Sequence, residues 1–387
     1  MLNNIERQEL IKLLSDLVSI PSINPTGEEK EVTNYLCDLF QKEGISYRLI
    51  DVTEERKVIV AKIEGENHDN AIIFTGHQDV VPISDDEMKR WQTYPFEPVI
   101  KDGKLYGRGS SDMKGGVSAA VYAALMLKRN NLTPNHDILL VLTCDEEHYM
   151  LGSRQAILDD EIKRAKYCIV CEPTEMKICY ASKGRTWAEV IVHGKTAHGS
   201  QRGIGINAIE KCSDLIQDIK KYDFSYTKNE LTGATFWQPY AINAGVEPAI
   251  VPDRCSMFVD ARLTLGHSCD DVWNSLKKLI DERNSNNDSI KAEIRVVENR
   301  EPWITDKDDY IIALTKKILG KYQTDIQYDV FKGTTDGTKF KSIGITPIIF
   351  GPGDLSCVHK ENESIDLAEL ERATEIYYEI MKTYSYK

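Results

Sequence analysis

The spacing of apolar residues predicts a succession of helices and strands along this chain. Apolar residues recur at helical spacing over about 5–18 and again from Glu28 to about Phe40, which predicts two amphipathic helices. Beyond Phe40, short runs rich in Val and Ile alternate with helical stretches, which is typical of an α/β layer with a mostly parallel sheet. The expected strands cover 47–52, 57–63, 71–74, 138–142 and 168–170, and the expected helices cover 117–127 and 154–158.

The middle third of the chain, from about Ile178 to Arg295, has the pattern of a separate, small α+β unit. Its expected elements are a strand over 185–193, a helix from near Gly205, a strand before the turn at Pro248, a strand over 255–263 and a helix over 270–283. The first pattern then resumes with a helix over 310–319 and a strand over 347–350. We therefore expect a discontinuous α/β domain, 1–178 with 295–387, interrupted by an inserted domain, 179–294.

The composition fits a globular protein and argues against several functions. At 387 residues the chain is too long for one compact core, and no apolar run approaches the roughly 20 residues that span a bilayer. The 48 Lys and Arg against 61 Asp and Glu give a net charge of −13, which argues against nucleic acid as a partner. The first residues lack the basic start and apolar centre of a signal peptide, so we expect a cytoplasmic protein whose nine cysteines are thiols.

Histidines and carboxylates follow the predicted strands at intervals. They are His77 and Asp79 after strand 71–74, Glu146 and Glu147 after strand 138–142, Glu172 after strand 168–170 and His359 after strand 347–350. Because open α/β sheets carry their sites at the carboxyl ends of the strands, we expect these side chains to lie together. With Asp112, at the glycine-rich entry to helix 117–127, they supply ligands for two divalent metals and a spare carboxylate as base. The set indicates a metal-dependent hydrolase.

Two pairs among these residues suggest which side chain binds metal and which one assists. His77 and Asp79 lie two positions apart, so the Asp79 carboxylate can receive an imidazole N–H while the other ring nitrogen binds metal. Glu146 and Glu147 are adjacent and point in opposite directions, so one can bind metal while the other faces substrate as a base. Each pattern alone also fits an ordinary surface pair, and Asp112 alone also fits a helix cap; the repeated placement after strands favours a site.

Seven motifs occur in order over nearly the whole chain. They are Gly76–Pro82, Gly107–Gly115, Asp145–Glu147, Cys171–Thr174, Gly194–Ser200, Gly333–Gly337, and Gly351–Gly353 leading to His359. With these motifs the chain resembles the M20 metallopeptidases, which include acetylornithine deacetylase, succinyl-diaminopimelate desuccinylase, aminoacylase and glutamate carboxypeptidase.

The resemblance implies a dizinc centre in the α/β domain, with Co²⁺ or Mn²⁺ as alternatives. By position, His77 and Glu172 would hold one zinc, Glu147 and His359 the other, and Asp112 would bridge them. Asp79 would then orient His77, and Glu146 would be the general base.

The resemblance also implies a ferredoxin-like inserted domain that acts as a lid and forms a homodimer. His198, in this domain, would steady the oxyanion, usually in the active site of the partner subunit. Arg262 matches a family arginine that pairs with a substrate carboxylate, and Thr334 and Thr335 would hydrogen-bond the same group.

The implied reaction removes the acyl group from an N-acyl amino acid, through attack of a dizinc-bridging hydroxide on the amide with Glu146 as general base. The alternative is a dipeptidase or carboxypeptidase on the same metal site, and a non-catalytic metal-binding scaffold is a remote third. The deacetylase and desuccinylase members usually carry Asn shortly before a Val-Pro that is Val251-Pro252 here, whereas this chain has Ala249 and Ile250. The sequence therefore leaves the acyl group and the amino acid open.

Overall fold

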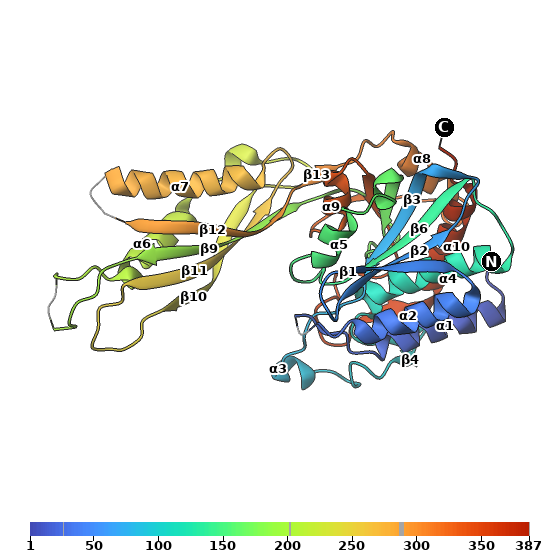
Figure 1. The fold of residues 1–387 in the computed structure, drawn as a ribbon, viewed down its shortest axis with the longest axis horizontal. Helices are drawn as coiled ribbons and strands as arrows, with labels where there is room; N and C mark the ends of the chain where they lie inside the picture. The colour runs from blue at the N-terminus through green and yellow to red at the C-terminus, as the bar shows by residue number, and fades with distance from the viewer. Residues whose placement is uncertain (26, 201–202, 286–289, 387) are drawn as a thin grey trace. The chain divides into compact units, whose positions relative to one another are not determined.

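The computed structural model describes residues 1–25, 27–200, 203–285 and 290–386, and the chain divides into two compact units (Figure 1). The first unit comprises Met1–Ala181, Thr305–Phe331 and Thr335–Lys387, and the inserted unit comprises Ser182–Ile304 and Lys332–Thr334. The inserted unit extends beyond the expected end at 294 because a strand that the sequence analysis did not predict, β12 (Lys291–Arg300), pairs with β9 (Gly184–His193).

The first unit is built on a sheet with the strand order β1-β2-β6-β3-β7-β15-β8. The strands β6, β3, β7 and β15 run parallel to one another, and the antiparallel pairs lie toward the edges, so the expected mostly parallel sheet is confirmed. All eight residues of β6 are buried, as expected for a central strand covered on both faces. The bounds are β1 (Ser46–Asp51), β2 (Lys57–Ile63), β3 (Asn67–His77), β6 (His136–Thr143), β7 (Ala165–Val170), β8 (Ile178–Ser182) and β15 (Thr346–Ile349).

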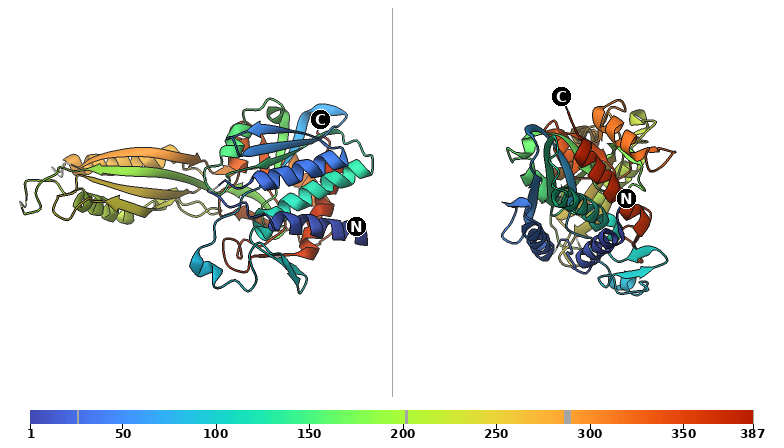
Figure 2. Two further views of the ribbon diagram at one scale, coloured as in Figure 1. Left: turned by 60° about the horizontal axis from the view of Figure 1, so that its bottom comes forward. Right: turned by 90° about the vertical axis from the view of Figure 1, so that its right-hand side faces the viewer.

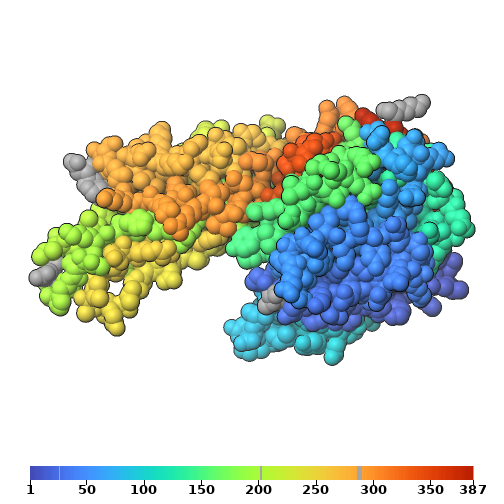
Figure 3. All heavy atoms as spheres, in the orientation of Figure 1, coloured from blue at the N-terminus to red at the C-terminus, as the bar shows by residue number. Residues whose placement is uncertain are grey.

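Helices α1 (Asn4–Val18), α2 (Lys30–Glu43), α4 (Gly115–Arg129) and α10 (Leu367–Thr383) gather beside this sheet (Figure 2). The blue residues of the N-terminal segment form much of the visible surface of the unit in Figure 3. The sequence analysis expected α1 and α2 but not α10. The remaining elements of the unit are α3 (Asp85–Met88), β4 (Val99–Lys101), β5 (Lys104–Tyr106), α5 (Leu151–Ala156), α8 (Tyr310–Leu319), β14 (Tyr328–Phe331), α9 (Gly337–Ser342) and β16 (Ser364–Asp366).

The inserted unit has the order β9-α6-β10-β11-α7-β12 and a four-stranded antiparallel sheet in the order β10-β11-β9-β12. This is the expected ferredoxin-like arrangement. Apolar residues of both helices pack on one face of the sheet, with Leu215 of α6 and Leu276 of α7 among them. The bounds are α6 (Ala208–Lys221), β10 (Phe236–Ala244), β11 (Arg254–Leu263), α7 (Cys269–Ser285) and β13 (Trp303–Ile304). Across the described part of both units, every helix is too short or too polar to span a bilayer.

Candidate metal centre

The carboxyl ends of four neighbouring parallel strands carry most of the candidate ligands. His77 ends β3, while Glu147 follows β6, Glu172 follows β7 and His359 follows β15. Asp112 comes from the kinked segment Ser110–Lys114 that leads into α4, and its own backbone is not helical (φ −118°, ψ 98°). The start of α4 fits closely against the chain that follows β7, because a Cβ added to Gly116 would lie 1.8 Å from the carbonyl oxygen of Cys171.

Asp112 lies between the two histidines and presents one carboxylate oxygen to each. Its Oδ1 is 3.1 Å from His77 Nε2, and its Oδ2 is 3.2 Å from His359 Nε2. Glu172 Oε1 lies 3.8 Å from His77 Nε2, and Glu147 Oε1 lies 3.1 Å from His359 Nε2. The structure therefore brings the five candidate ligands together as two His–carboxylate groups that share Asp112.

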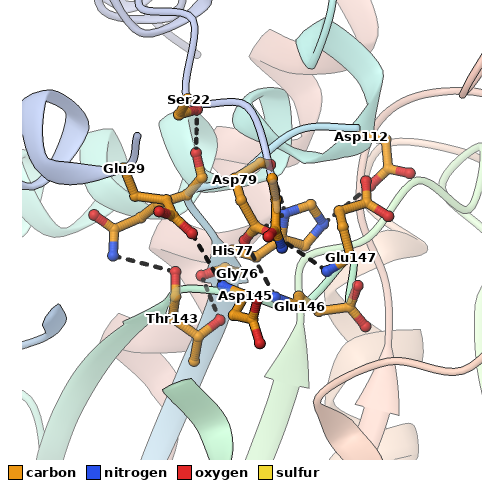
Figure 4. A network of polar contacts seen from close by, with 12 residues as sticks. Ser22, Glu29, Gly76, His77, Asp79, Asp112, Thr143, Asp145, Glu146 and Glu147 are labelled. Atoms are coloured by element: carbon orange, nitrogen blue, oxygen red, sulfur yellow. Dashed lines mark hydrogen bonds and ion pairs between the residues drawn. The ribbon is translucent and has the colours of Figure 1, made fainter. Parts of the chain in front are cut away.

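Glu146 and Glu147 leave the backbone in different directions. Glu147 extends beside the His77 ring toward Asp112, and the Glu146 side chain points away from Asp112 (Figure 4). An oxygen of Glu146 nevertheless lies within 4.8 Å of ligand atoms of both His77 and Glu172. The Glu146 carboxylate thus lies beside the candidate metal ligands but points in a different direction from Glu147. A carboxylate in this position can accept a proton from a group bound at the cluster.

The ligand cluster strongly perturbs the protonation of its members. Burial and the charge of Asp112 raise the pKa of Glu147, and the same two causes raise the pKa of Glu172 well above its usual range. Burial lowers the pKa of His359, but hydrogen bonds to Asp112 and Glu147 outweigh it and raise that pKa to about 11. These raised pKa values favour the protonated forms, and divalent cations bound here would displace the protons. Two imidazoles and three carboxylates are a donor set that fits two such ions.

The Asp79 carboxylate does not have the contact that the sequence analysis expected. His77 Nδ1 is 2.9 Å from the backbone carbonyl oxygen of Asp79 and 3.7 Å from its carboxylate, so the main chain holds the imidazole. The carboxylate instead accepts the backbone N–H groups of Glu146 and Glu147, at 3.2 and 3.1 Å. Asp79 thus fixes the start of the acidic segment as well as the ring of His77.

A buried arginine that the sequence analysis did not single out supports this arrangement. The guanidinium of Arg56 donates to Glu29 at 3.1 Å, to Asp145 at 2.6 Å and to Asn24 at 2.7 Å. Asn24 in turn donates to Asp79 at 2.8 Å. Burial, followed by the charge of Asp79, raises the pKa of Glu29 to about 7. Arg56 therefore supplies positive charge and fixed geometry directly behind the segment that carries Glu146 and Glu147.

Glu363 supports Asp112 in a comparable way. Its Oε1 accepts the backbone N–H groups of Ser111 and Asp112, both at 3.0 Å, and its Oε2 accepts from Arg108 Nη1 at 2.8 Å. Glu363 is fully buried. Like Arg56, Glu363 was not among the candidate site residues of the sequence analysis, and its partners lie far away along the chain.

The other candidate residues are divided between the two units. His198, Arg262 and Thr334 belong to the inserted unit, and Thr335 belongs to the first. His198 is exposed, with Nδ1 2.8 Å from Ser200 Oγ. Thr334 Oγ1 accepts from Arg300 Nη1 at 3.2 Å, and the buried Thr335 accepts the N–H of Gly337 at 3.2 Å.

Comparisons with known proteins identify relatives along the whole chain. The model for "Peptidase family M20/M25/M40" matches residues 73–383. The "Probable succinyl-diaminopimelate desuccinylase" of Staphylococcus aureus (strain N315) is 30% identical, covering 94% of this chain and 95% of its own. Among solved structures, the M20 family metallo-carboxypeptidase Sso-CP2 from Sulfolobus solfataricus has a TM-score of 0.78 at 23% identity, covering 97% of this chain and 98% of its own. The Bacillus subtilis YXEP protein, a dinuclear metal-binding peptidase, has a TM-score of 0.73 at 14% identity, covering 99% of this chain and 100% of its own.

We expect Arg56→Leu to lower the free energy of unfolding by about 3–5 kcal/mol, because the change leaves Glu29 and Asp145 buried without their cation. Urea unfolding measures this effect. Arg56→Lys keeps the charge but not the three-way hydrogen bonding, so it should cost less. The matched control is Arg48→Leu, since Arg48 is more exposed and its pairs with Asp159 and Glu161 should contribute at most about 1 kcal/mol. Equal effects at the two positions would contradict the role assigned to Arg56.

Proposed function

Since the chain belongs to peptidase family M20/M25/M40 and is therefore a metallohydrolase that acts on amide bonds, we propose that it removes the acyl group from N-acyl amino acids. The position of Asp112 between His77 and His359 carries the proposal of a two-metal reaction. The similarity to a probable desuccinylase over nearly the full length of both proteins favours an acyl amino acid as substrate.

We propose that the centre holds two divalent ions, with zinc as the first candidate and Co²⁺ or Mn²⁺ as alternatives. His77 and Glu172 would hold one ion, and His359 and Glu147 the other, with one oxygen of Asp112 for each. Ions bound there would polarise the amide carbonyl and make a water molecule more acidic.

In the proposed reaction Glu146 moves the proton. Its carboxylate accepts a proton from the attacking water and returns it to the nitrogen of the leaving amine. This role needs a carboxylate in a fixed position. The backbone N–H groups of the acidic segment donate to Asp79, which also accepts from Asn24, and Arg56 donates to Asn24. These hydrogen bonds support a fixed position for Glu146. His198 would donate a hydrogen bond to the developing oxyanion.

Arg262 would hold a carboxylate of the substrate, with Thr334 and Thr335 as hydrogen-bonding neighbours. A planar guanidinium suits this task because it can donate two parallel hydrogen bonds to one carboxylate. The same metal centre would serve a dipeptidase or carboxypeptidase, a possibility supported by the fold shared with Sso-CP2. The need for a free amino group in the substrate separates these activities from deacylation.

We propose a homodimer formed by the inserted unit. Strand β10 is an edge of its sheet and exposes the apolar side chains of Phe236, Tyr240 and Ile242 to 46, 61 and 55%. A long edge strand with exposed apolar residues is a ready template for pairing with a second chain. A dimer of this kind also gives His198 a partner subunit on which to act.

We expect Asp112→Asn to reduce the number of tightly bound metal ions per chain, because the carboxylate presented to both histidines loses its charge. Elemental analysis after gel filtration in metal-free buffer measures the retained metal. Asp51→Asn, at an exposed position of β1, is the matched control and should retain the wild-type amount. Full retention of two ions by the Asp112 variant would remove it from the bridging position.

We expect Glu146→Gln to retain metal but to lose turnover by about 10²–10⁴-fold, since the amide cannot accept the proton. The assay is hydrolysis of acetyl-, succinyl- and formyl-amino acids and of dipeptides, with chelation followed by addition of zinc or cobalt. Glu66→Gln, at an exposed position, is the control. Near-normal turnover by the Glu146 variant would refute its role, and a failure of the wild-type enzyme on every acylated substrate would refute deacylation.

We expect chains carrying His198→Ala and chains carrying Glu146→Gln to recover activity when they are combined in one dimer. In such a dimer the site of the His198→Ala chain keeps its own Glu146 and receives His198 from its partner, so one of the two sites is complete. Adding Ile242→Lys to both chains should abolish both the recovery and the dimer in analytical ultracentrifugation, because a lysine on an edge strand opposes pairing. Val296→Lys, on the opposite edge strand β12, is the control. A verified mixed dimer without activity would place His198 in the site of its own chain.

A further inference from the structure

Arg108 is a fully buried arginine in the glycine-rich motif, four positions before Asp112. Burying a charge is costly unless other groups receive it, so the partners of such a guanidinium show which parts of the fold it joins. The partners of Arg108 come from two segments that lie far from it along the chain. They are the α3 segment, residues 84–92, and the His359 segment, residues 351–363.

Arg108 connects the loop that carries Asp112 to the loop that carries His359. Its Nη1 donates to the backbone carbonyl oxygen of Lys360 at 3.2 Å and to Glu363 Oε2 at 2.8 Å. Lys360 directly follows His359 in the chain. The other oxygen of Glu363 accepts the backbone N–H of Asp112 at 3.0 Å. One terminal nitrogen of Arg108 therefore joins the main chain beside one candidate ligand to the support of another.

The α3 segment fixes the orientation of the Arg108 guanidinium. Arg108 Nη2 donates to Glu87 Oε1, and the guanidinium lies over the Trp91 ring, 5.5 Å from the ring centroid. Trp91 donates its indole N–H to the same oxygen of Glu87 at 3.3 Å. A planar guanidinium that is held both on its face and at two nitrogens has little freedom to turn. Its Nη1 therefore points toward the His359 segment in a fixed direction.

The α3 segment also contacts the His359 segment directly. The backbone N–H of Gln92 donates to Asn362 Oδ1 at 2.8 Å, and Asn362 Nδ2 donates to the backbone carbonyl oxygen of Arg90 at 3.4 Å. Arg90 Nε lies 3.2 Å from Glu361 Oε1. These contacts place the α3 segment firmly against the chain that follows His359.

His359 depends on such contacts more than His77 does. His77 is the last residue of β3, which has a hydrogen-bonded strand on either side. His359 lies in a turn, and its backbone has a positive φ of 58°, while Asn362 has a φ of 60°. Left-handed backbone conformations are uncommon for residues other than glycine, so the surroundings of the His359 segment have to hold it in this shape.

Asp112 has a further support that does not involve Arg108. The buried Lys114 donates from Nζ to two backbone carbonyl oxygens around the end of α1, at 2.8 and 2.7 Å. This side chain ties the glycine-rich motif to the first helix of the unit. Loss of the Arg108 contacts should therefore displace His359 more than Asp112.

We propose that Arg108 is a positioning residue for the metal centre, which sets the place of His359 relative to Asp112 and with it the affinity for the ion assigned to His359. The inference rests on the proposed two-metal function and adds to it a residue that would contact neither ion. The other ion, assigned to His77 and Glu172, should depend far less on Arg108. Its two ligands stand at or directly after the ends of strands in the central sheet.

Titration of the metal-free protein with Co²⁺ tests this role without any substrate. Visible absorption reports the coordination of each bound ion, calorimetry gives the two affinities, and His359→Ala identifies the binding step that needs His359. Arg108→Lys keeps the charge but not the fork that reaches Lys360 and Glu87 together. We expect it to weaken the His359 step by about 10- to 100-fold and the other step by less than about threefold.

Arg129→Lys is the matched control. Arg129 also pairs with two carboxylates, those of Glu9 and Glu43, and lies over the ring of Tyr122, but these partners lie outside the segments that carry the candidate ligands. Both Co²⁺ affinities of this variant should equal those of the wild type. Urea unfolding of each metal-free variant measures the loss of stability separately from the loss of affinity.

A second variant covers the case in which Arg108→Lys does not fold. Glu363→Gln replaces one of the two acceptor oxygens by an amide group, and it should weaken the same His359 step.

The role of Arg108 is overturned if the folded variants bind both ions as the wild type does, if both steps weaken equally, or if Arg129→Lys has the same effect. In these cases a wild-type protein with two Co²⁺ ions leaves the proposed two-metal function standing. A wild-type protein that binds fewer than two ions overturns the two-metal centre, and the role of Arg108 with it.

Discussion

The first unit depends on offsetting the unfavourable free energy of burying several carboxylates at one edge of its sheet. Glu29, Asp79, Asp145, Glu146 and Glu172 are all buried there, and an uncompensated buried charge is far less stable than one in water. The fold offsets this cost with backbone N–H donors and with the guanidinium of Arg56. So many carboxylates can be buried together only because these hydrogen-bond donors and the Arg56 cation lie beside them.

Two kinds of group compensate the charges of these carboxylates: hydrogen-bond donors of the protein, and groups that a bound metal ion could replace. Asp79, Asp145 and Glu29 are bound by Arg56, Asn24 and backbone N–H groups. Glu147 and Glu172 have as their main partners histidines and protons, which a metal ion can replace. The permanent partners hold the segment in place, and the replaceable ones leave the ligand atoms open to cations.

The sequence could predict that the candidate ligands lie together because they obey a rule of topology. His77, Glu147, Glu172 and His359 each follow an apolar strand, and neighbouring parallel strands bring such positions together. Arg56, Glu29 and Glu363 obey no such rule, since each acts across a long separation along the chain and resembles an ordinary charged residue. The spacing argument also could not predict the direction of the Asp79 carboxylate. It places the side chains of His77 and Asp79 on one face, but it does not consider that the backbone carbonyl of Asp79 competes for the imidazole N–H. Strand β12 escaped prediction because it is rich in charged residues and lies where the domain boundary was expected.

The two units solve opposite electrostatic problems with the same device. In the first unit, backbone N–H groups hold the carboxylate of Asp79. In the inserted unit, the buried Asp260 accepts the Nε–H groups of Arg185 and Arg262. In both cases one edge of a charged group is used for structure, which fixes the direction of the other edge. A charge oriented in this way loses little conformational entropy when its ligand arrives, so more of the interaction is available for selecting that ligand.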